Sequence, residues 1–281
     1  MYTLQDLKIA FENVGLTKLF EEMQHYAKNS IVIELNGESD EQVIGASRFG
    51  GDPDLPAELE WFNNEESGAP LNFVAQLNCA DLTPFDQDNK LPTHGILYFF
   101  YDVDAFLWGF DQKDYVGSRV YFYDGSFENL ETRPCPAGIK RFTPCTLTFS
   151  NQIDLPEYSS QLIQTTLSDD EYERYLDLQE SLELVVDNKL LGHSNNIQNG
   201  MELQCELVRH GIYCGSSAAY HDPRVPELAP GRLDWQLLFQ IASNEETDMK
   251  WGDDGNLYFW IRAEDLKAGR FDYAWQILQS Y

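Results

Sequence analysis

The segment 48–56 combines one arginine, two adjacent glycines and two prolines. Glycine adopts positive φ at no steric cost and exposes backbone N–H groups, whereas proline stiffens the chain. Arg48 is the only cation between Lys28 and Lys90, and a guanidinium can hold a carboxylate or phosphate through two parallel hydrogen bonds. The alternative is a rigid turn whose arginine neutralises neighbouring acids. The candidate ligand-binding residues of this segment are Arg48, Gly50, Gly51 and Asp52.

Two glutamines interrupt apolar runs that resemble each other. Residues 71–77 align with residues 235–241, which places Gln76 opposite Gln240. An amide in an apolar strand is costly unless it finds hydrogen-bond partners. Each glutamine therefore either ties its own strand to a neighbouring loop or, together with the other, lines one ligand site.

Two polar loops provide the remaining candidates. His193 lies in the Gly-, Asn- and Ser-rich loop 192–200, where a histidine acts as a base or a ligand, or hydrogen-bonds a turn carbonyl. The acidic loop 245–256 contains Trp251 and a turn signal, but its spacing does not match a calcium-binding loop. We therefore expect no specific metal, and we add His193, Trp251 and both glutamines to the candidate ligand-binding set.

The elements that must position these residues fall into an internal repeat. Downstream of the glutamine strands, residues 95–101 align with residues 255–261 and share Gly, Leu, Tyr and Phe in order. Alternation along the first glutamine strand places Phe73, Ala75 and Leu77 on one face and the glutamine on the other. Each repeat is predicted to be a meander of antiparallel strands.

The chain is predicted to form a single compact domain over residues 1–281. Helical spacing predicts N-terminal helices in 1–29, and a capping box at Ser168–Glu171 begins a connecting helix within 165–183. Strand-and-turn patterns fill a first strand unit, 30–150, and a second, 184–281. The predicted fold class is α+β and strand-rich, with internally duplicated antiparallel or mixed sheet units that share a core.

The charge excludes several classes of partner. Among 281 residues, 47 Asp and Glu stand against 19 Lys and Arg, which gives a formal net charge of −28. General nucleic-acid binding and docking on anionic membranes both require clustered cations. No membrane span or signal peptide is evident, and five cysteines are few for a disulfide scaffold. We expect a cytoplasmic monomer or small oligomer.

Standard catalytic and nucleotide-binding motifs are missing from the sequence. It contains neither a phosphate-binding G-x-x-x-x-G-K-[ST] loop nor a dinucleotide-binding G-x-G-x-x-G turn. Gly45–Phe49 lacks the second glycine of a nucleophile elbow. We therefore expect no cofactor, and the sequence favours binding over catalysis.

Several motifs resemble the YwqG-like family of bacterial proteins of unknown function. They are residues 47–56, Trp61, Pro70-Leu71 with the Gln76 strand, 91–100, 191–193 with 197–198, and 237–241 with 251–255. This resemblance covers nearly the whole chain and implies a soluble α+β protein with an internal duplication. It implies no established reaction. Related members are associated with bacterial toxin and immunity loci.

Two hypotheses for function follow. The first is a non-catalytic acidic binding protein that masks a basic protein partner, such as a toxin enzyme. The alternative is a small-molecule binder or an unfamiliar enzyme that uses a cleft between the two repeats, with loops 48–56 and 192–198 and the two glutamines.

Overall fold

The computed structural model of the chain describes residues 2–38, 43–160 and 162–281. The α-helices are α1 (Leu4–Asn13), α2 (Thr17–Met23), α3 (Cys79–Leu82), α4 (Asp169–Ser181), α5 (Glu202–Arg209), α6 (Val225–Leu228) and α7 (Ala263–Lys267). Short 3-10 helices are η1 (Gln24–Tyr26), η2 (Gln112–Gly117), η3 (Phe127–Asn129), η4 (Ser217–His221), η5 (Ala229–Asp234) and η6 (Phe271–Tyr273).

The strands are β1 (Lys28–Glu38), β2 (Arg48–Phe49), β3 (Asp54–Pro56), β4 (Asn72–Asn78), β5 (Ile96–Tyr101), β6 (Ser118–Tyr123), β7 (Leu130–Thr132), β8 (Cys145–Asp154), β9 (Lys189–Leu191), β10 (Trp235–Ala242), β11 (Asn256–Arg262) and β12 (Trp275–Gln279). Ten of them form one sheet in the order β12-β11-β10-β9-β1-β8-β2-β4-β5-β6, and β3 pairs with β7. Adjacent strands are antiparallel. Counted outwards from the central β1–β8 pair, β9 matches β2, β10 matches β4, β11 matches β5 and β12 matches β6.

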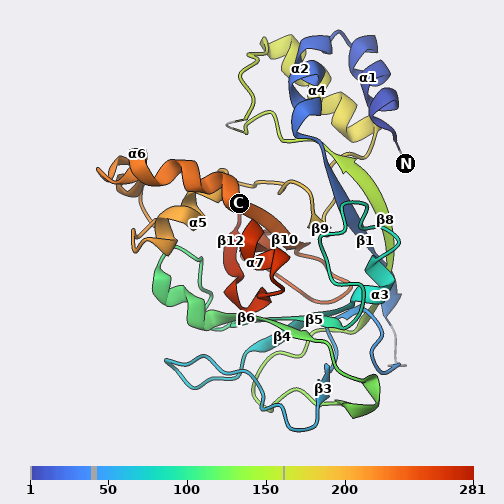
Figure 1. Ribbon diagram of the computed structural model, residues 1–281, viewed down its shortest axis with the longest axis vertical. Coiled ribbons are helices and arrows are strands. Elements are labelled where there is room, and N and C mark those ends of the chain that lie inside the picture. The colour runs from blue at the N-terminus through green and yellow to red at the C-terminus, as the bar shows by residue number, and fades with distance from the viewer. Residues whose placement is uncertain (1, 39–42, 161) are drawn as a thin grey trace.

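The large sheet curls so that its two halves face each other across one core (Figure 1). The ring of Phe99 on β5 lies 4.5 Å from that of Phe239 on β10 and 5.1 Å from that of Phe259 on β11, measured between centroids. The ring of Phe49 on β2 contacts the same Phe239 at 5.7 Å. These rings are 0% exposed, and burial of each stabilises the fold by about 1.5–3 kcal/mol. The strand-rich α+β architecture and the shared core are therefore confirmed.

Each half of the sheet contains a β-bulge that interrupts the predicted alternation of side chains between the two faces of the strand. The pairing of β4 with β5 shifts between Phe73 and Ala75, and that of β10 with β11 shifts between Leu237 and Phe239. Because the extra residue reverses the facing of the strand, Phe73 packs in a different apolar cluster from Ala75 and Leu77. The prediction that these three side chains share one face is wrong for Phe73.

Helices α1, α2 and α4 form a separate lobe above the sheet, at the ends of β1 and β8 (Figure 1). Capping boxes begin α1 at Thr3 and α4 at Ser168, and the second of these is the capping box that the sequence predicts. Apolar side chains from all three helices make one cluster, with Phe11, Phe20 and Tyr175 among its buried members. The helix expected to connect the two strand units thus packs on the N-terminal helices.

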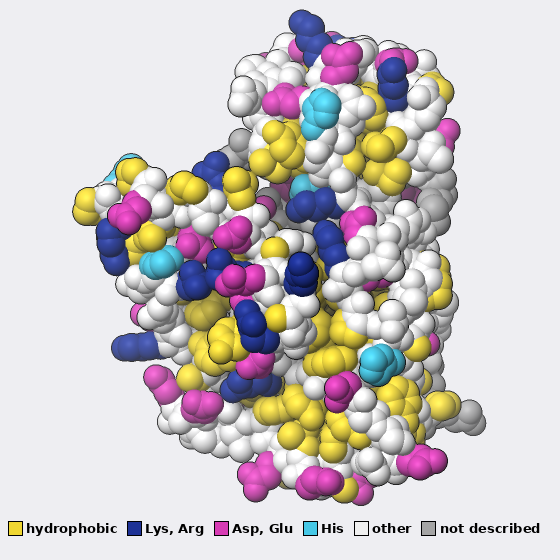
Figure 2. Space-filling model, viewed as in Figure 1, with side chains coloured by type: hydrophobic (Ala, Val, Ile, Leu, Met, Phe, Trp, Pro, Cys, Tyr) yellow, Lys and Arg dark blue, Asp and Glu magenta, His cyan; other side chains and the backbone are white. Residues whose placement is uncertain are grey.

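Helices α5 and α6, with η4 and η5, form an arm beside the sheet. A hollow separates this arm from the helical lobe, and Lys or Arg and His side chains gather in it (Figure 2). The loop that follows β9 runs along the bottom of the hollow, since His193, Asn196 and Gln198 line cavities there. Within the described ranges, no helix has both the length and the apolar character needed to cross a membrane.

Candidate functional site

Four residues near β2 form a buried hydrogen-bonded set that we call the first network: Arg48, Asp54, Gln76 and Tyr98. Arg48 Nη2 lies 2.9 Å from Asp54 Oδ2, which also accepts a 2.8 Å hydrogen bond from Gln76 Nε2. Gln76 Oε1 accepts from the backbone N–H of Asp54 at 2.9 Å, and the Tyr98 hydroxyl donates to the Asp54 carbonyl. Arg48 is 4% exposed and Gln76 is 0% exposed. The network ties β2, β4 and β5 to the start of β3.

The two glycines and Asp52 form the turn between β2 and β3. Gly50 and Gly51 have φ of 61° and 74°, the left-handed region that glycine enters without strain. Asp52 Oδ1 accepts from the backbone N–H of Cys135 at 2.9 Å and from Arg141 Nε at 3.1 Å. Burial raises the pKa of Asp52, but these hydrogen bonds outweigh it and the pKa is lowered. The turn is therefore closed by the segment that follows β7.

A second network lies at the corresponding place in the other half of the sheet: Lys189, Asn195, Gln240, Tyr258 and Asp154. Gln240 Oε1 accepts from the backbone N–H of Asn195 at 2.9 Å, and the Tyr258 hydroxyl donates to the Asn195 carbonyl at 2.5 Å. Lys189 Nζ donates to Asn195 Oδ1 at 2.9 Å and to Asp154 Oδ2 at 2.8 Å. Gln240 Nε2 donates to the backbone carbonyls of Val186 and Asp187, which directly precede β9. Each glutamine thus holds a loop adjoining its own strand.

His193 lies in the turn after β9 and is 8% exposed. Its Nε2 lies 2.7 Å from the Tyr26 carbonyl oxygen. Since a carbonyl only accepts, Nε2 carries the proton and Nδ1 keeps a lone pair. Burial, with repulsion from Lys28, lowers the pKa of His193 from 6.5 to about 4. His193 is therefore neutral near pH 7 and bonds a turn carbonyl.

Trp251 belongs to the core and is 0% exposed. Its ring meets those of Tyr101 and Phe142 edge-on, at 5.8 Å between centroids in each case. It therefore lies in the core next to the 50–51 turn, since the Phe142 carbonyl accepts from the backbone N–H of Gly51 at 2.9 Å. Among the residues the structure describes, no group of three or more His, Cys, Asp or Glu side chains is arranged to hold a metal ion.

The structure thus brings the sequence candidates together in two places. Arg48, Gln76 and the 50–52 turn meet at β2, whereas Gln240 and His193 meet at β9, and strands β1 and β8 lie between β9 and β2. Both glutamine residues are 0% exposed to solvent.

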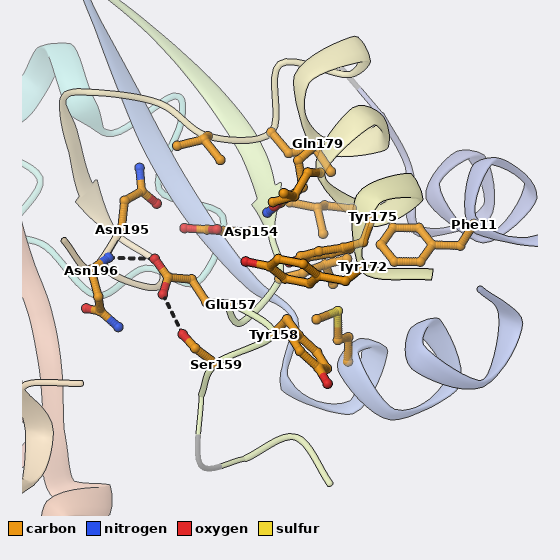
Figure 3. Close-up of a pocket in the computed structure, with 16 residues that line it drawn as sticks. Phe11, Asp154, Glu157, Tyr158, Ser159, Tyr172, Tyr175, Gln179, Asn195 and Asn196 are labelled. Carbon is orange, nitrogen blue, oxygen red and sulfur yellow. Dashed lines mark hydrogen bonds between the residues drawn. The ribbon is translucent and has the colours of Figure 1, made fainter. Parts of the chain in front are cut away.

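A cavity of about 250 Å³, which we call the aromatic pocket, opens between the helical lobe and the end of β8. Tyrosine rings from α4 and from the segment after β8 form one side, and carboxylates and amides form the other (Figure 3). The lining side chains used below are Asp154, Glu157, Tyr158, Tyr172, Tyr175, Leu176, Val185, Asn195 and Asn196.

The tyrosine rings of the aromatic pocket are held close to one another. The Tyr158 ring lies 5.6 Å from that of Tyr172 and 6.1 Å from that of Tyr175, between centroids. The Tyr158 hydroxyl accepts a 3.0 Å hydrogen bond from the backbone N–H of Leu167, which fixes that ring. Tyr175 is 4% exposed and Tyr172 is 42% exposed. The three rings therefore form a wall that reaches from the interior to the surface.

Glu157 is a carboxylate of the aromatic pocket that has no ion-pair partner among the described residues, although the more distant Lys189 attracts it. Its carboxylate accepts from the backbone N–H of Asn196 at 2.5 Å and from Ser159 Oγ at 3.1 Å. No Lys, Arg or His nitrogen of the described residues lies within 4.0 Å of it. Burial raises the pKa of Glu157 despite these two hydrogen bonds, which lower it. The neighbouring Asp154, by contrast, is paired with Lys189 at 2.8 Å.

Sequence reasoning missed this pocket. Tyr172 and Tyr175 fall within the predicted connecting helix, and Glu157 is one of 47 Asp and Glu residues. The available signal was a carboxylate flanked by Pro156 and Tyr158, followed by two tyrosines at helical spacing. That signal does not reveal which residues meet, because α1, α4 and the loop after β9 all contribute.

The family described as "Domain of unknown function (DUF1963)" matches residues 47–280. The chain therefore belongs to this family, which includes the YwqG-like proteins, and the resemblance is confirmed at that level. No curated protein matches the sequence.

Proposed function

We propose that the protein is a non-catalytic binding protein whose aromatic pocket takes a basic side chain, a lysine ammonium or an arginine guanidinium, of a protein partner. The observation that carries the proposal is the partly buried Glu157 carboxylate, which has no ion-pair partner among the described residues and lies beside three tyrosine rings. A bound cation supplies the missing counter-charge.

The tyrosine rings supply the second attraction. A cation near the face of an aromatic ring gains about 0.5–1 kcal/mol when exposed and about 2 kcal/mol when desolvated. Tyr158, Tyr172 and Tyr175 all line the cavity that Glu157 borders (Figure 3). A flexible alkyl chain with a charged end suits such a pocket, because its methylene groups contact the rings while its charge reaches the carboxylate.

The surface around the pocket suits a basic partner. The exposed side of α4 carries five carboxylates, which are Asp169, Asp170, Glu173, Asp177 and Glu180. At the mouth of the pocket, Tyr172, Leu176 and Val185 are 42%, 44% and 55% exposed. Apolar groups ringed by like charges favour a partner of opposite charge, and the net charge of −28 steers its approach.

The test is titration with a short peptide that carries one lysine, compared with the same peptide carrying norleucine. Glu157→Gln removes the charge but keeps an oxygen that accepts from Asn196. We expect it to weaken binding of the lysine peptide about tenfold or more, because a hydrogen bond to a charged group contributes about 1.5–3 kcal/mol. Fluorescence anisotropy measures the Kd.

Glu173→Gln is the matched control, since it removes the same charge from the exposed face of α4. Solvent screens that charge, so we expect its Kd to stay close to that of the unaltered protein. Equal losses in the two variants, or equal binding of the norleucine peptide, would contradict the proposal.

We also infer that the two halves of the sheet derive from one duplicated unit. Supporting this, Arg48 and Lys189 pair with Gln76 and Gln240 in corresponding strands, and each glutamine accepts from the backbone N–H six residues beyond the cation. Sequence profiles built separately from the two halves of family members should detect each other; profiles that do not would contradict the duplication.

A further inference from the structure

A cavity of about 630 Å³ lies in the hollow between the arm and the helical lobe (Figure 2). We call it the groove. The start of β1, the loop after β9, α5 and η5 all contribute to its lining. Volumes of about 300–1,000 Å³ are typical of small-molecule sites. The groove adjoins the aromatic pocket, since Ser159 and Asn196 line both.

Two cations of the groove lack a carboxylate partner among the described residues. Of the 19 Lys and Arg residues, thirteen lie within 4.0 Å of a carboxylate oxygen in the described part of the chain. The other six are Lys18, Lys28, Lys113, Arg232, Lys250 and Lys267. Four of these six are exposed, whereas Lys28 and Arg232 are partly shielded from solvent. Both shielded cations line the groove.

A shielded, unpaired cation is costly in a protein with an excess of carboxylates. Taking an ammonium out of water without a counter-charge destabilises the charged form. Burial lowers the pKa of Lys28, and Glu202, which also lines the groove, only partly opposes this effect. An anion bound between the walls removes that cost.

The other residues that line the groove indicate what kind of uncharged group the anion should carry. Phe110, Tyr220 and Trp235 supply aromatic surface, which suits an apolar group. Ser216 and Ser217 supply hydroxyl groups, and His193 also borders the groove. The lining thus combines apolar walls with a few polar groups.

We propose that the groove is a second binding site, for a small organic anion with an apolar body, either a phosphate ester or a carboxylate, whose charge is balanced by Lys28 and Arg232. This site is separate from the aromatic pocket and takes a ligand of opposite charge.

The test measures thermal stabilisation and calorimetric binding with phenyl phosphate, benzoate and neutral benzyl alcohol at constant ionic strength. We expect an anion to raise the Tm and the neutral alcohol to leave it unchanged. The preference between phenyl phosphate and benzoate identifies the anionic group. Lys28→Met and Arg232→Met should each weaken anion binding about tenfold.

Controls keep the outcome decisive. Lys250→Met removes an exposed lysine that has no carboxylate partner among the described residues and should leave the affinity unchanged. Lys28→Met should not lower the Tm of the free protein, because it replaces a shielded, unpaired charge with an apolar chain. Equal anion affinity in all variants, or no anion-specific stabilisation at all, would overturn the proposal. Neither result bears on lysine-peptide binding.

Discussion

The first and second networks tie corresponding strands to corresponding loops, but they place their carboxylates differently. In the first network the residue whose backbone N–H the glutamine accepts from also supplies the carboxylate: this is Asp54 at the start of β3, and Thr132 of β7 donates to it at 2.7 Å. In the second network the loop residue is an amide, Asn195, and the carboxylate is Asp154 at the end of β8. The second loop continues as Asn196, whose backbone N–H holds Glu157.

As a result, the loop of the first network is covered by other parts of the chain, whereas the loop of the second network borders two cavities. The first loop is covered by β7 and the segment after it, through hydrogen bonds to Asp52 and Asp54. Asn195 and Asp154 of the second network line the aromatic pocket, and His193 lines the groove. A shared framework therefore positions a structural turn in one half and the proposed binding loop in the other.

The largest difference between the two networks is expected when the cation of each, Lys189 or Arg48, is replaced. Lys189→Met should lower the free energy of unfolding by about 3–5 kcal/mol, because it leaves a buried carboxylate unpaired. Asp154 would keep a single donor among the described residues, the backbone N–H of His193 at 2.9 Å. Urea unfolding with a fixed m-value measures the loss.

Arg48→Met should cost less than Lys189→Met. Asp54 keeps donors from Gln76, Gly45 and Thr132. In addition, Nε and Nη1 of Arg48 have no hydrogen-bond partner among the described residues, so the substitution removes two unsatisfied groups. An equal or larger loss for Arg48→Met would show that the two networks do not differ in this way.

The next effect separates structure from binding. Gln76→Leu and Gln240→Leu should each cost about 1–3 kcal/mol, since each leaves a buried backbone N–H without its acceptor. Gln240→Leu should also weaken lysine-peptide binding, because Asn195 precedes the residue that holds Glu157. Unfolding and peptide titration on the same samples check both. A matching loss of binding in Gln76→Leu would point to a global effect instead.

The smallest effect is the response to mild acid. His193 lies four residues after Lys189, just as Asp52 lies four residues after Arg48. Burial lowers the pKa of His193 to about 4. Its unfolded form binds a proton below about pH 6.5, so stability falls as the pH drops from 6.5 towards 4, by under about 1 kcal/mol at pH 6. Asp52, whose pKa is lowered, contributes its loss only in stronger acid. Lys28, Lys189 and Asp154 also face His193.

Unfolding at a series of pH values measures this slope, and His193→Gln should flatten it between pH 6.5 and 4. Glutamine keeps a donor for the Tyr26 carbonyl. An unchanged slope in the variant would assign the acid response to other groups.

The sequence predicted local features better than long-range ones. The capping box at Ser168 and the matching of Gln76 with Gln240 could be read from neighbouring residues. The bulge before Ala75 could not, because it depends on pairing with β5. The pairing of β1 with β8 also joins segments more than a hundred residues apart, and hydrophobic patterning carries no information about such partners.

The site residues follow the same division. Arg48 and the adjoining glycines stood out because their types are unusual in an acidic stretch. Glu157 did not, because its significance comes from what surrounds it: tyrosines of α4, the loop after β9 and the absence of a cation among the described neighbours. Charge pairing is a three-dimensional property, so a sequence read alone cannot separate paired from unpaired carboxylates.

The position of β1 has a practical consequence for work on the family. The matched region begins at residue 47, whereas β1 lies before it and pairs with β8 on one side and β9 on the other. A recombinant fragment cut to 47–280 would split the sheet and leave the ten-residue strand β8 and the three-residue strand β9 with unpaired edges, and unpaired edges invite aggregation. The evolutionary boundary and the folding boundary of this protein therefore differ by a central strand.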